Sequence, residues 1–185
     1  TGVQTCALPI FKGKKILEPK DFNTRPLKDL AKESIFNIIL HSNKFEINLR
    51  NSNILDLFSG VGSFGIECLS RGVKKVIFIE NYKGVLPILK KNIQSLKSIN
   101  NYQIYENDIY SENTFSAIEI KFDIIFLDPP YKYKNLDTIF QKMKRNTCMY
   151  MCIHKHNTYR YVCMYIYIYV VERQYKPYDI KKKET

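Results

Sequence analysis

A glycine-rich loop that joins a short apolar strand to a helix constrains the fold of this chain most strongly. Residues 53–58 (Asn-Ile-Leu-Asp-Leu-Phe) predict a buried strand, and a helix closed by Gly72 is expected over residues 63–71. Three glycines in the G-x-G-x-x-G spacing connect the two: Gly60, Gly62 and Gly65. This succession is typical of a βαβ unit that binds a ligand at the end of a parallel sheet. A tight structural turn without a ligand is the alternative.

Acidic residues near this loop distinguish between two kinds of cofactor. Glu80 ends the strand expected over residues 74–80, about 20 residues after the loop, where a carboxylate suits the hydroxyls of a ribose. Asp56 stands inside the strand before the glycines. Its carboxylate would repel the pyrophosphate of a dinucleotide but would attract the ammonium of S-adenosylmethionine. The sequence therefore favours S-adenosylmethionine as the cofactor.

The alternation of strands and helices predicts an α/β fold. We expect a Rossmann-like, mostly parallel twisted sheet with helices on both faces and right-handed crossovers. A third strand, over residues 102–108, ends on Asp108, which could accept the adenine amino group or cap a helix. The acidic strand ends would then line one edge of the sheet: Asp56, Glu80, Asp108 and Asp128.

Two helices should pack on this sheet. The first should begin with Thr24 as its cap and Pro26 in its first turn, and the second should cover residues 82–99 with Pro87 near its start. Helical spacing predicts that the first buries Leu27, Leu30, Ala31, Ile35 and Ile38, and that the second buries Leu86, Leu89, Ile93 and Leu96.

The stretch over residues 122–131 (Phe-Asp-Ile-Ile-Phe-Leu-Asp-Pro-Pro-Tyr) presents a second chemical motif. Its apolar run predicts a buried strand, which Pro129 and Pro130 end because neither nitrogen can donate to a ladder. Asp128 is thereby held at the carboxyl edge, followed by the ring of Tyr131. A carboxylate and a rigid carbonyl could each accept an N–H of an aromatic amine, while the ring stacks on the base. An ordinary strand followed by a proline-rich turn is the alternative.

Charge indicates a polyanionic partner. Among the 185 residues, 29 Lys and Arg stand against 18 Asp and Glu, which favours nucleic acid. A basic hairpin is expected within residues 10–24, and the candidate RNA contacts are Lys12, Lys14, Lys15, Arg25, Lys28 and Lys32. The lysines could also be no more than a soluble surface. No apolar run approaches a membrane span, no signal peptide is visible, and the five cysteines lack zinc spacing, so we expect a cytoplasmic protein.

The two ends of the chain differ from its middle. Residues 1–9 look like a non-native leader, and residues 10–145 form the expected domain. Residues 146–185 are an atypical tail rich in Tyr and Lys that looks like translation in a wrong frame, with a possible edge strand over residues 165–171. Cys152, His154 and His156 lie beside no second ligand cluster, so no metal site is expected.

The motifs together resemble a known enzyme family. Residues 54–65, Glu80, Asp108 and the Asp-Pro-Pro-Tyr motif at residues 128–131 resemble the Rossmann-like methyltransferases that use S-adenosylmethionine to modify amino groups. Residues 11–16 and 24–37 narrow the resemblance to the bacterial 16S ribosomal RNA (guanine(966)-N(2))-methyltransferase family. The resemblance covers about residues 10 to 145. The family's sheet has seven strands, so the sheet is expected to be incomplete or aberrant at its C-terminal strands.

The resemblance implies a function and roles. The chain would transfer a methyl group from S-adenosylmethionine to the exocyclic N2 of a guanine in 16S ribosomal RNA, free or in an assembling small subunit, and would act as a monomer. Asp128, Pro129, Pro130 and Tyr131 would hold the flipped guanine, and Asp56, Gly60, Gly62, Glu80 and Asp108 would hold the cofactor. Leu30 and Lys32 stand where the family tends to have arginines, which would weaken the grip on phosphate.

Three other functions stay open at this point. A DNA adenine-N6 methyltransferase shares both motifs, although this chain has little room for a target-recognition segment. A non-catalytic RNA-binding remnant would bind RNA without the cofactor. An NAD-dependent dehydrogenase is disfavoured by Asp56 and by the absence of a recognisable proton-relay histidine.

Overall fold

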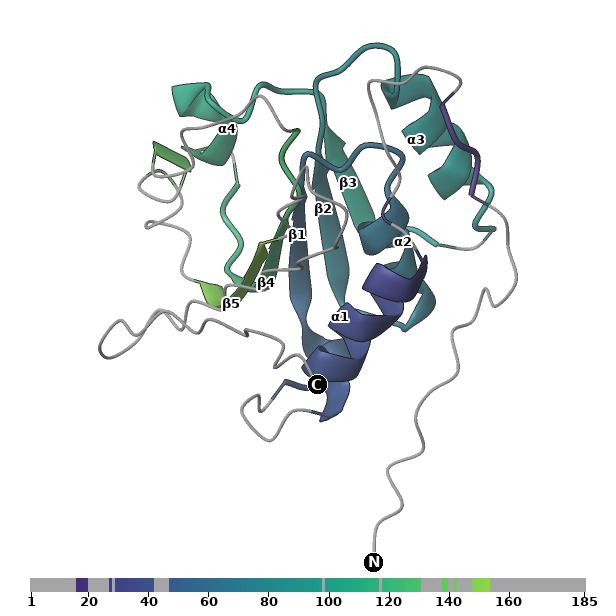
Figure 1. Cartoon of the computed structure of the whole chain (residues 1–185). Coiled ribbons are helices and arrows are strands. Elements are labelled where there is room, and N and C mark those ends of the chain that lie inside the picture. The colour runs from purple at the N-terminus through teal and green to yellow at the C-terminus, as the bar shows by residue number, and fades with distance from the viewer. Residues whose placement is uncertain are drawn as a thin grey trace, which may run out of the picture.

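The protein is described here from a computed structural model. It describes residues 16–19, 27, 29–41, 47–97, 99–116, 118–130, 138–139, 142 and 148–153. Within them five strands form one sheet in the order β3-β2-β1-β4-β5 (Figure 1). The strands are β1 (Asn53–Leu57), β2 (Lys75–Ile79), β3 (Tyr102–Tyr105), β4 (Phe122–Leu127) and β5 (Cys148–Ile153).

All four strand pairings are parallel, which confirms the expected sheet type. The chain runs from the central β1 outward to β2 and β3, and then returns to add β4 and β5 on the other side of β1. The strand order therefore reverses between β1 and β4. In open α/β sheets such a reversal opens a crevice at the carboxyl ends of the strands, and ligands bind there.

Helices cover both faces of the sheet (Figure 1). They are α1 (Asp29–His41), α2 (Ser63–Ser70), α3 (Leu86–Gln94) and α4 (Glu112–Ser116), with a short 3-10 turn at Leu49–Asn51. One apolar cluster joins α1, α2 and α3 to the sheet, and a second joins the other face to Phe115, Ile118 and Ile139. The sheet is thus the middle of three layers, as the Rossmann-like prediction requires.

A column of aromatic rings links α1, α2 and β4. The ring of Phe64 stacks on that of Phe126, with centroids 4.0 Å apart, and on that of Phe36, with centroids 5.3 Å apart. The guanidinium of Arg71 lies over the ring of Phe36, 4.2 Å from its centroid. Since Phe126 stands two residues before Asp128, this packing fixes the end of β4 against the helix that follows the glycine loop.

The helix predictions are partly confirmed. In α3 and just after it, Leu86, Leu89, Ile93 and Leu96 are all buried, and Pro87 lies in the first turn. In α1, however, Leu30 is 79% exposed, so its predicted burial was wrong. The buried stripe of α1 consists of Ile35, Phe36 and Ile39, and Leu30 lies on the opposite side of the helix. Leu27 is buried, Ala31 and Ile38 are half-buried, and Thr24 and Pro26 lie outside the described residues.

The chain ends bear on three further predictions. Most of the expected hairpin lies outside the described residues, and at Leu17 both backbone groups bond to the side chain of Asn92 instead of a neighbouring strand. β5, within the segment predicted to be an atypical tail, pairs with β4 along its whole length. The possible edge strand over residues 165–171 lies outside the described residues.

Candidate functional site

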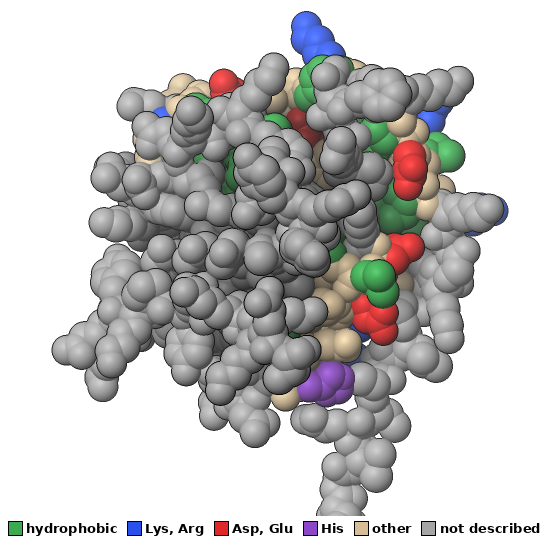
Figure 2. Space-filling view, in the orientation of Figure 1, with side chains coloured by type: hydrophobic (Ala, Val, Ile, Leu, Met, Phe, Trp, Pro, Cys, Tyr) green, Lys and Arg blue, Asp and Glu red, His purple; other side chains and the backbone are tan. Residues whose placement is uncertain are grey.

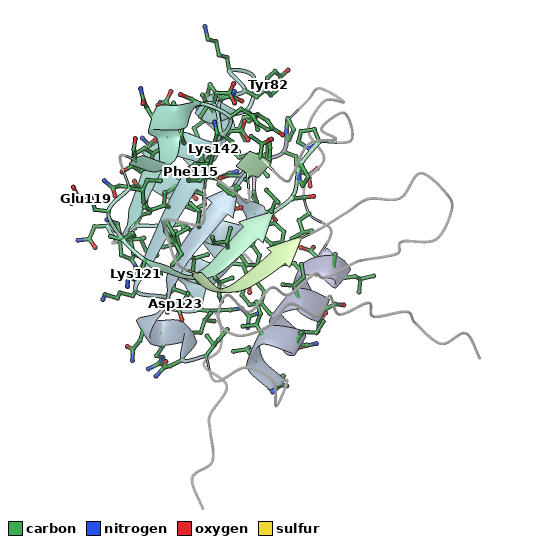
Figure 3. The ribbon with its side chains drawn as sticks, turned by 90° about the vertical axis from the view of Figure 1, so that its left-hand side faces the viewer. Tyr82, Phe115, Glu119, Lys121, Asp123 and Lys142 are labelled. Atoms are coloured by element: carbon green, nitrogen blue, oxygen red, sulfur yellow. The ribbon has the colours of Figure 1, made fainter. Side chains whose placement is uncertain are left out.

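The candidate site lies where β1, β2 and β4 end. Leu57 pairs with Ile79 of β2 and with Leu127 of β4, so the next residues along these strands are Phe58, Glu80 and Asp128. In Figure 3, Tyr82, which follows β2, lies at the opposite end of the molecule from Asp123, the second residue of β4. This is the arrangement expected of parallel strands, whose first residues lie together at one end of the sheet and whose last residues lie together at the other. The sheet therefore gathers three of the four predicted acidic residues, Asp56, Glu80 and Asp128, at one edge.

The loop after β1 turns sharply through three residues with positive φ. These are Phe58 (54°), Gly60 (55°) and Gly62 (83°). Ser59 makes several of the contacts that hold the turn: its N–H donates to the carbonyl of Ile79 (3.2 Å), its hydroxyl donates to the carbonyl of Asp56 (2.6 Å), and its carbonyl accepts from the N–H of Gly62 (2.8 Å). Positive φ at an aromatic residue is strained. Residues with such strained backbones cluster at functional sites, and Phe58 lies at the same edge of the sheet as Glu80 and Asp128.

Two of the three glycines are needed for close packing of the helix on the sheet. A Cβ on Gly65 would lie 2.2 Å from Cε1 of Phe78 and 2.9 Å from Oδ2 of Asp56. A Cβ on Gly62 would lie 2.5 Å from Cδ1 of Leu89. The side chains of Phe78 and Leu89 are fully buried. Gly62 and Gly65 therefore bring α2 close to β2 and α3.

Glu80 fastens the loop by accepting backbone hydrogen bonds with both carboxylate oxygens. Oε2 accepts from the N–H of Gly60 (2.8 Å), and Oε1 accepts from the N–H groups of Asn81 (2.9 Å) and Tyr82 (2.8 Å). The side chain is 8% exposed. An ionised carboxylate has about four acceptor sites, and Oε1 uses two of them and Oε2 one, so Glu80 can orient the loop and still accept one hydroxyl group at Oε2.

Asp56 is the most deeply buried acid of the site. Its side chain is 1% exposed, and Oδ2 accepts from the N–H of Gly65 (3.0 Å). Burial raises the pKa of the Asp56 carboxyl well above its usual range. The hydrogen bond from the Gly65 N–H lowers this pKa, and the negative charges of Asp128 and Glu80 raise it. The three carboxyl groups thus repel one another, and a cation bound among them would relieve that repulsion.

The second motif continues this edge. Asp128 is half-buried directly after β4, followed by the half-buried Pro129 and the exposed Pro130. The two prolines end the strand as predicted. Tyr131, which the sequence analysis assigned to stacking, lies outside the described residues.

Asp108, unlike Glu80 and Asp128, does not follow directly on a strand. β3 ends at Tyr105, and Asp108 lies exposed in the loop before α4. Its Oδ1 accepts from the N–H of Tyr110 (2.9 Å), and its carbonyl accepts from the buried hydroxyl of Thr114 (2.6 Å). The expected strand over residues 102–108 was therefore three residues too long, because Asp108 forms a turn that leads into α4.

Most of the predicted RNA contacts lie outside the described residues: Lys12, Lys14, Lys15, Arg25 and Lys28. Lys32 is described, and its Nζ bonds to Oδ1 of Asp29 at 2.9 Å. Figure 2 shows that, on the face it presents, the Lys and Arg side chains of the described residues are scattered around the rim.

Asn92 is a polar residue of the site region that the sequence analysis missed. It lies on α3, is 4% exposed, and its Nδ2 donates to the carbonyl of Val61 (3.0 Å) between Gly60 and Gly62. A signal was available, because an uncharged polar residue beside Leu89 and Ile93 on the buried stripe of a helix requires a buried hydrogen-bond partner.

Two searches of the described residues found nothing further. No helix among them is long and apolar enough to cross a membrane. No group of three or more His, Cys, Asp and Glu side chains in the same part of the chain could hold a metal ion.

Comparison with known proteins places this geometry in context. The family described as "Conserved hypothetical protein 95" matches residues 10–159, a range that includes β5. "Putative rRNA methyltransferase YlbH" of Bacillus subtilis is 37% identical over 131 residues, which are 69% of this chain and 67% of the relative. "Ribosomal RNA small subunit methyltransferase D" of Haemophilus influenzae is 33% identical over 129 residues, which are 67% of this chain and 62% of the relative.

The fold has counterparts among solved structures. "Putative methyltransferase yhhF from Escherichia coli" superposes with a TM-score of 0.62 at 24% identity, over 80% of this chain and 76% of that one. This similarity establishes a methyltransferase-like fold for the described sheet and helices.

Proposed function

Because this chain belongs to the conserved hypothetical protein 95 family, we propose that it is a methyltransferase that uses S-adenosylmethionine to methylate ribosomal RNA. The observation that carries the proposal is the meeting of Asp56, Glu80 and Asp128 at the point where the strand order reverses. The matched segments span only about two thirds of the relatives' lengths (67% and 62%), so substrate and activity are proposed for this chain rather than transferred to it.

The described residues fit a cationic cofactor. Asp56 places a carboxyl group in a buried setting beside the glycine loop, which suits the ammonium group of S-adenosylmethionine. Glu80 holds the loop through Gly60, and its Oε2 has one acceptor site left for a hydroxyl of a ribose. Asp108, exposed beside the same edge, would accept the adenine amino group. When bound, the cofactor supplies an electrophilic methyl group.

Residues 128–131 would activate the acceptor nitrogen. An exocyclic amine of a base is a weak nucleophile because its lone pair is delocalised into the ring. The Asp128 carboxylate and a carbonyl of the proline pair would each accept one N–H, which favours a pyramidal nitrogen with an available lone pair. Pro129 and Pro130 restrict the backbone there, and Tyr131 would stack on the extruded base. The acceptor we propose is N2 of a guanine.

The relatives described above are named for ribosomal RNA, which favours RNA over DNA as the substrate. On the same basis we propose 16S ribosomal RNA or an assembling small subunit as the partner, the cytoplasm as the compartment and a monomer as the active form.

Transfer of a tritiated methyl group from S-adenosylmethionine tests the proposal. The purified chain should label 16S ribosomal RNA and should not label duplex DNA, and digestion of the product should yield N2-methylguanosine. Asp128→Ala should abolish labelling while cofactor binding stays nearly intact. Glu119→Ala is the control, because Glu119 is exposed and precedes β4 at the opposite end of the strand from Asp128. Full activity of Asp128→Ala would refute the assigned role, and labelling of DNA alone would refute the substrate.

A further inference from the structure

Asn92 connects a segment near the start of the chain to the glycine loop. Its Oδ1 accepts from the N–H of Leu17 (2.8 Å), and its Nδ2 donates both to the carbonyl of Leu17 (3.1 Å) and to the carbonyl of Val61 (3.0 Å). Leu17 is 75 positions away in sequence, and Val61 is 31 positions away. Both amide protons and the amide oxygen are therefore used, and one buried side chain ties together three separate parts of the chain.

The contact is the principal polar attachment of residues 16–19 among the described residues. Figure 1 shows this segment, in purple, beside α3. The side chain of Leu17 is 54% exposed, so its burial contributes little to the attachment, while Ile16 packs at the margin of the apolar cluster. Loss of the Asn92 amide would leave the two backbone groups of Leu17 without these partners, and among the described contacts of the segment the packing of Ile16 would remain.

The other end of the same amide reaches the loop that we assign to the cofactor. Val61 is 1% exposed and stands between Gly60, whose N–H donates to Glu80, and Gly62, which begins α2. Leu89, one turn before Asn92 on α3, lies against Gly62. A shift of the loop therefore changes the position of the Val61 carbonyl, and through Asn92 it changes the attachment of Leu17.

We propose that Asn92 is a positioning residue that couples RNA binding to cofactor binding. The inference rests on the proposed function, in which Lys12, Lys14 and Lys15, directly before Ile16 in the chain, contact RNA. RNA bound there favours the attached arrangement of residues 16–19, and that arrangement holds Val61 in the place the cofactor requires. Coupling of two binding sites is reciprocal, so each ligand should tighten the binding of the other by the same factor, about fivefold or more.

Binding of each ligand in the presence and absence of the other measures this coupling. We would use S-adenosylhomocysteine and a transcript of 16S ribosomal RNA with the full chain. Asn92→Leu keeps the approximate shape of the side chain but has no hydrogen-bonding groups. Asn101→Leu is the matched control, because the Asn101 amide also donates to two carbonyls, those of Val73 (2.7 Å) and Lys74 (3.3 Å), away from the glycine loop. Asn92→Leu should reduce the coupling factor to about one, and Asn101→Leu should preserve it.

Hydrogen exchange on the unaltered chain provides a test that needs no variant. S-adenosylhomocysteine should slow exchange of the Leu17 amide about fivefold more than that of the Asn53 amide, which also donates to a side chain, Asp123 Oδ2 at 2.7 Å, but at the far end of the sheet. Equal slowing at both amides, or coupling that persists in folded Asn92→Leu, would overturn this inference alone. An unaltered chain that binds no cofactor would overturn the proposed function as well.

Discussion

Replacement of Gly65 by alanine tests the claim that this glycine serves packing. The added Cβ would lie 2.2 Å from Cε1 and 2.7 Å from Cζ of Phe78, whose side chain is fully buried in β2. Ordinary carbon contacts begin near 3.4 Å, so the ring or the helix must move by more than 1 Å. The ring has little room to move, because the core around it is densely packed.

The expected cost follows from two opposing terms. Overpacking of a core costs about 1–3 kcal/mol, and a clash with a buried ring belongs at the upper end. Alanine gains up to about 1 kcal/mol over glycine in a helix, and less in the first turn, where Gly65 lies. The free energy of unfolding should therefore fall by about 2 kcal/mol, which lowers the Tm by about 4–8 °C in a chain of this size.

Thermal and urea unfolding followed by circular dichroism would measure the change. Gly72→Ala is the matched control: Gly72 has φ of 76° and a Cβ there meets nothing within 4 Å, so only backbone strain of about 1–2 kcal/mol applies. Gly65→Ala should also weaken cofactor binding, because α2 would move away from Asp56, whereas Gly72→Ala should not. A Gly65→Ala protein as stable as the unaltered chain would refute the packing argument.

Three further outcomes are expected. Asp56→Asn should remove a pH dependence of the free energy of unfolding. Because burial raises the pKa of Asp56, the unaltered protein should lose stability as the pH rises from the ordinary carboxyl range through the raised pKa, whereas the variant with its neutral amide should not. Urea titrations at several pH values would show the difference. The same variant should bind S-adenosylmethionine more weakly, measured by calorimetry, because a carboxylate no longer meets the cationic ligand. Phe64→Ala should lower the free energy of unfolding by about 3–5 kcal/mol, measured by urea denaturation, because it opens a cavity between Phe36 and Phe126. If Phe64→Leu cost as much as Phe64→Ala, lost volume would not be the cause.

Local pattern was sufficient to predict the centre of the fold. The glycine loop between β1 and α2 was predicted because glycines allow positive φ, and the end of β4 because prolines lack an N–H. The acidic residue after β2 was predicted from its place at the end of an apolar run. The burial of α3 followed from its apolar spacing. These features depend on neighbours in sequence, and they are the ones that the structure confirms.

Features that depend on distant partners could not be predicted in the same way. In α1, Leu30 was assigned to the buried face because it is as apolar as Ile35, and the burial of Phe36 was not predicted, because it packs on Phe64 of another helix. Asp108 was placed wrongly for a local reason: it has the same residue type as the acids at strand ends, but its bonds with Tyr110 and Thr114, two and six residues on, form a turn. The partners of Asn92 lie 75 and 31 residues away, beyond any local pattern.

The central place of β1 has a consequence for how the chain folds as it is synthesised. Its first neighbour, β2, follows soon after it, but the bond between the Asn53 N–H and Asp123 spans 70 residues. Until β4 emerges, one edge of an apolar strand is unpaired, and such edges invite pairing with other chains. Long-range parallel pairing is also slow to form. Nascent chains that end before β4 should therefore associate with one another or be held by chaperones, and this tendency should fall only when the chain extends through β5, which covers the outer edge of β4.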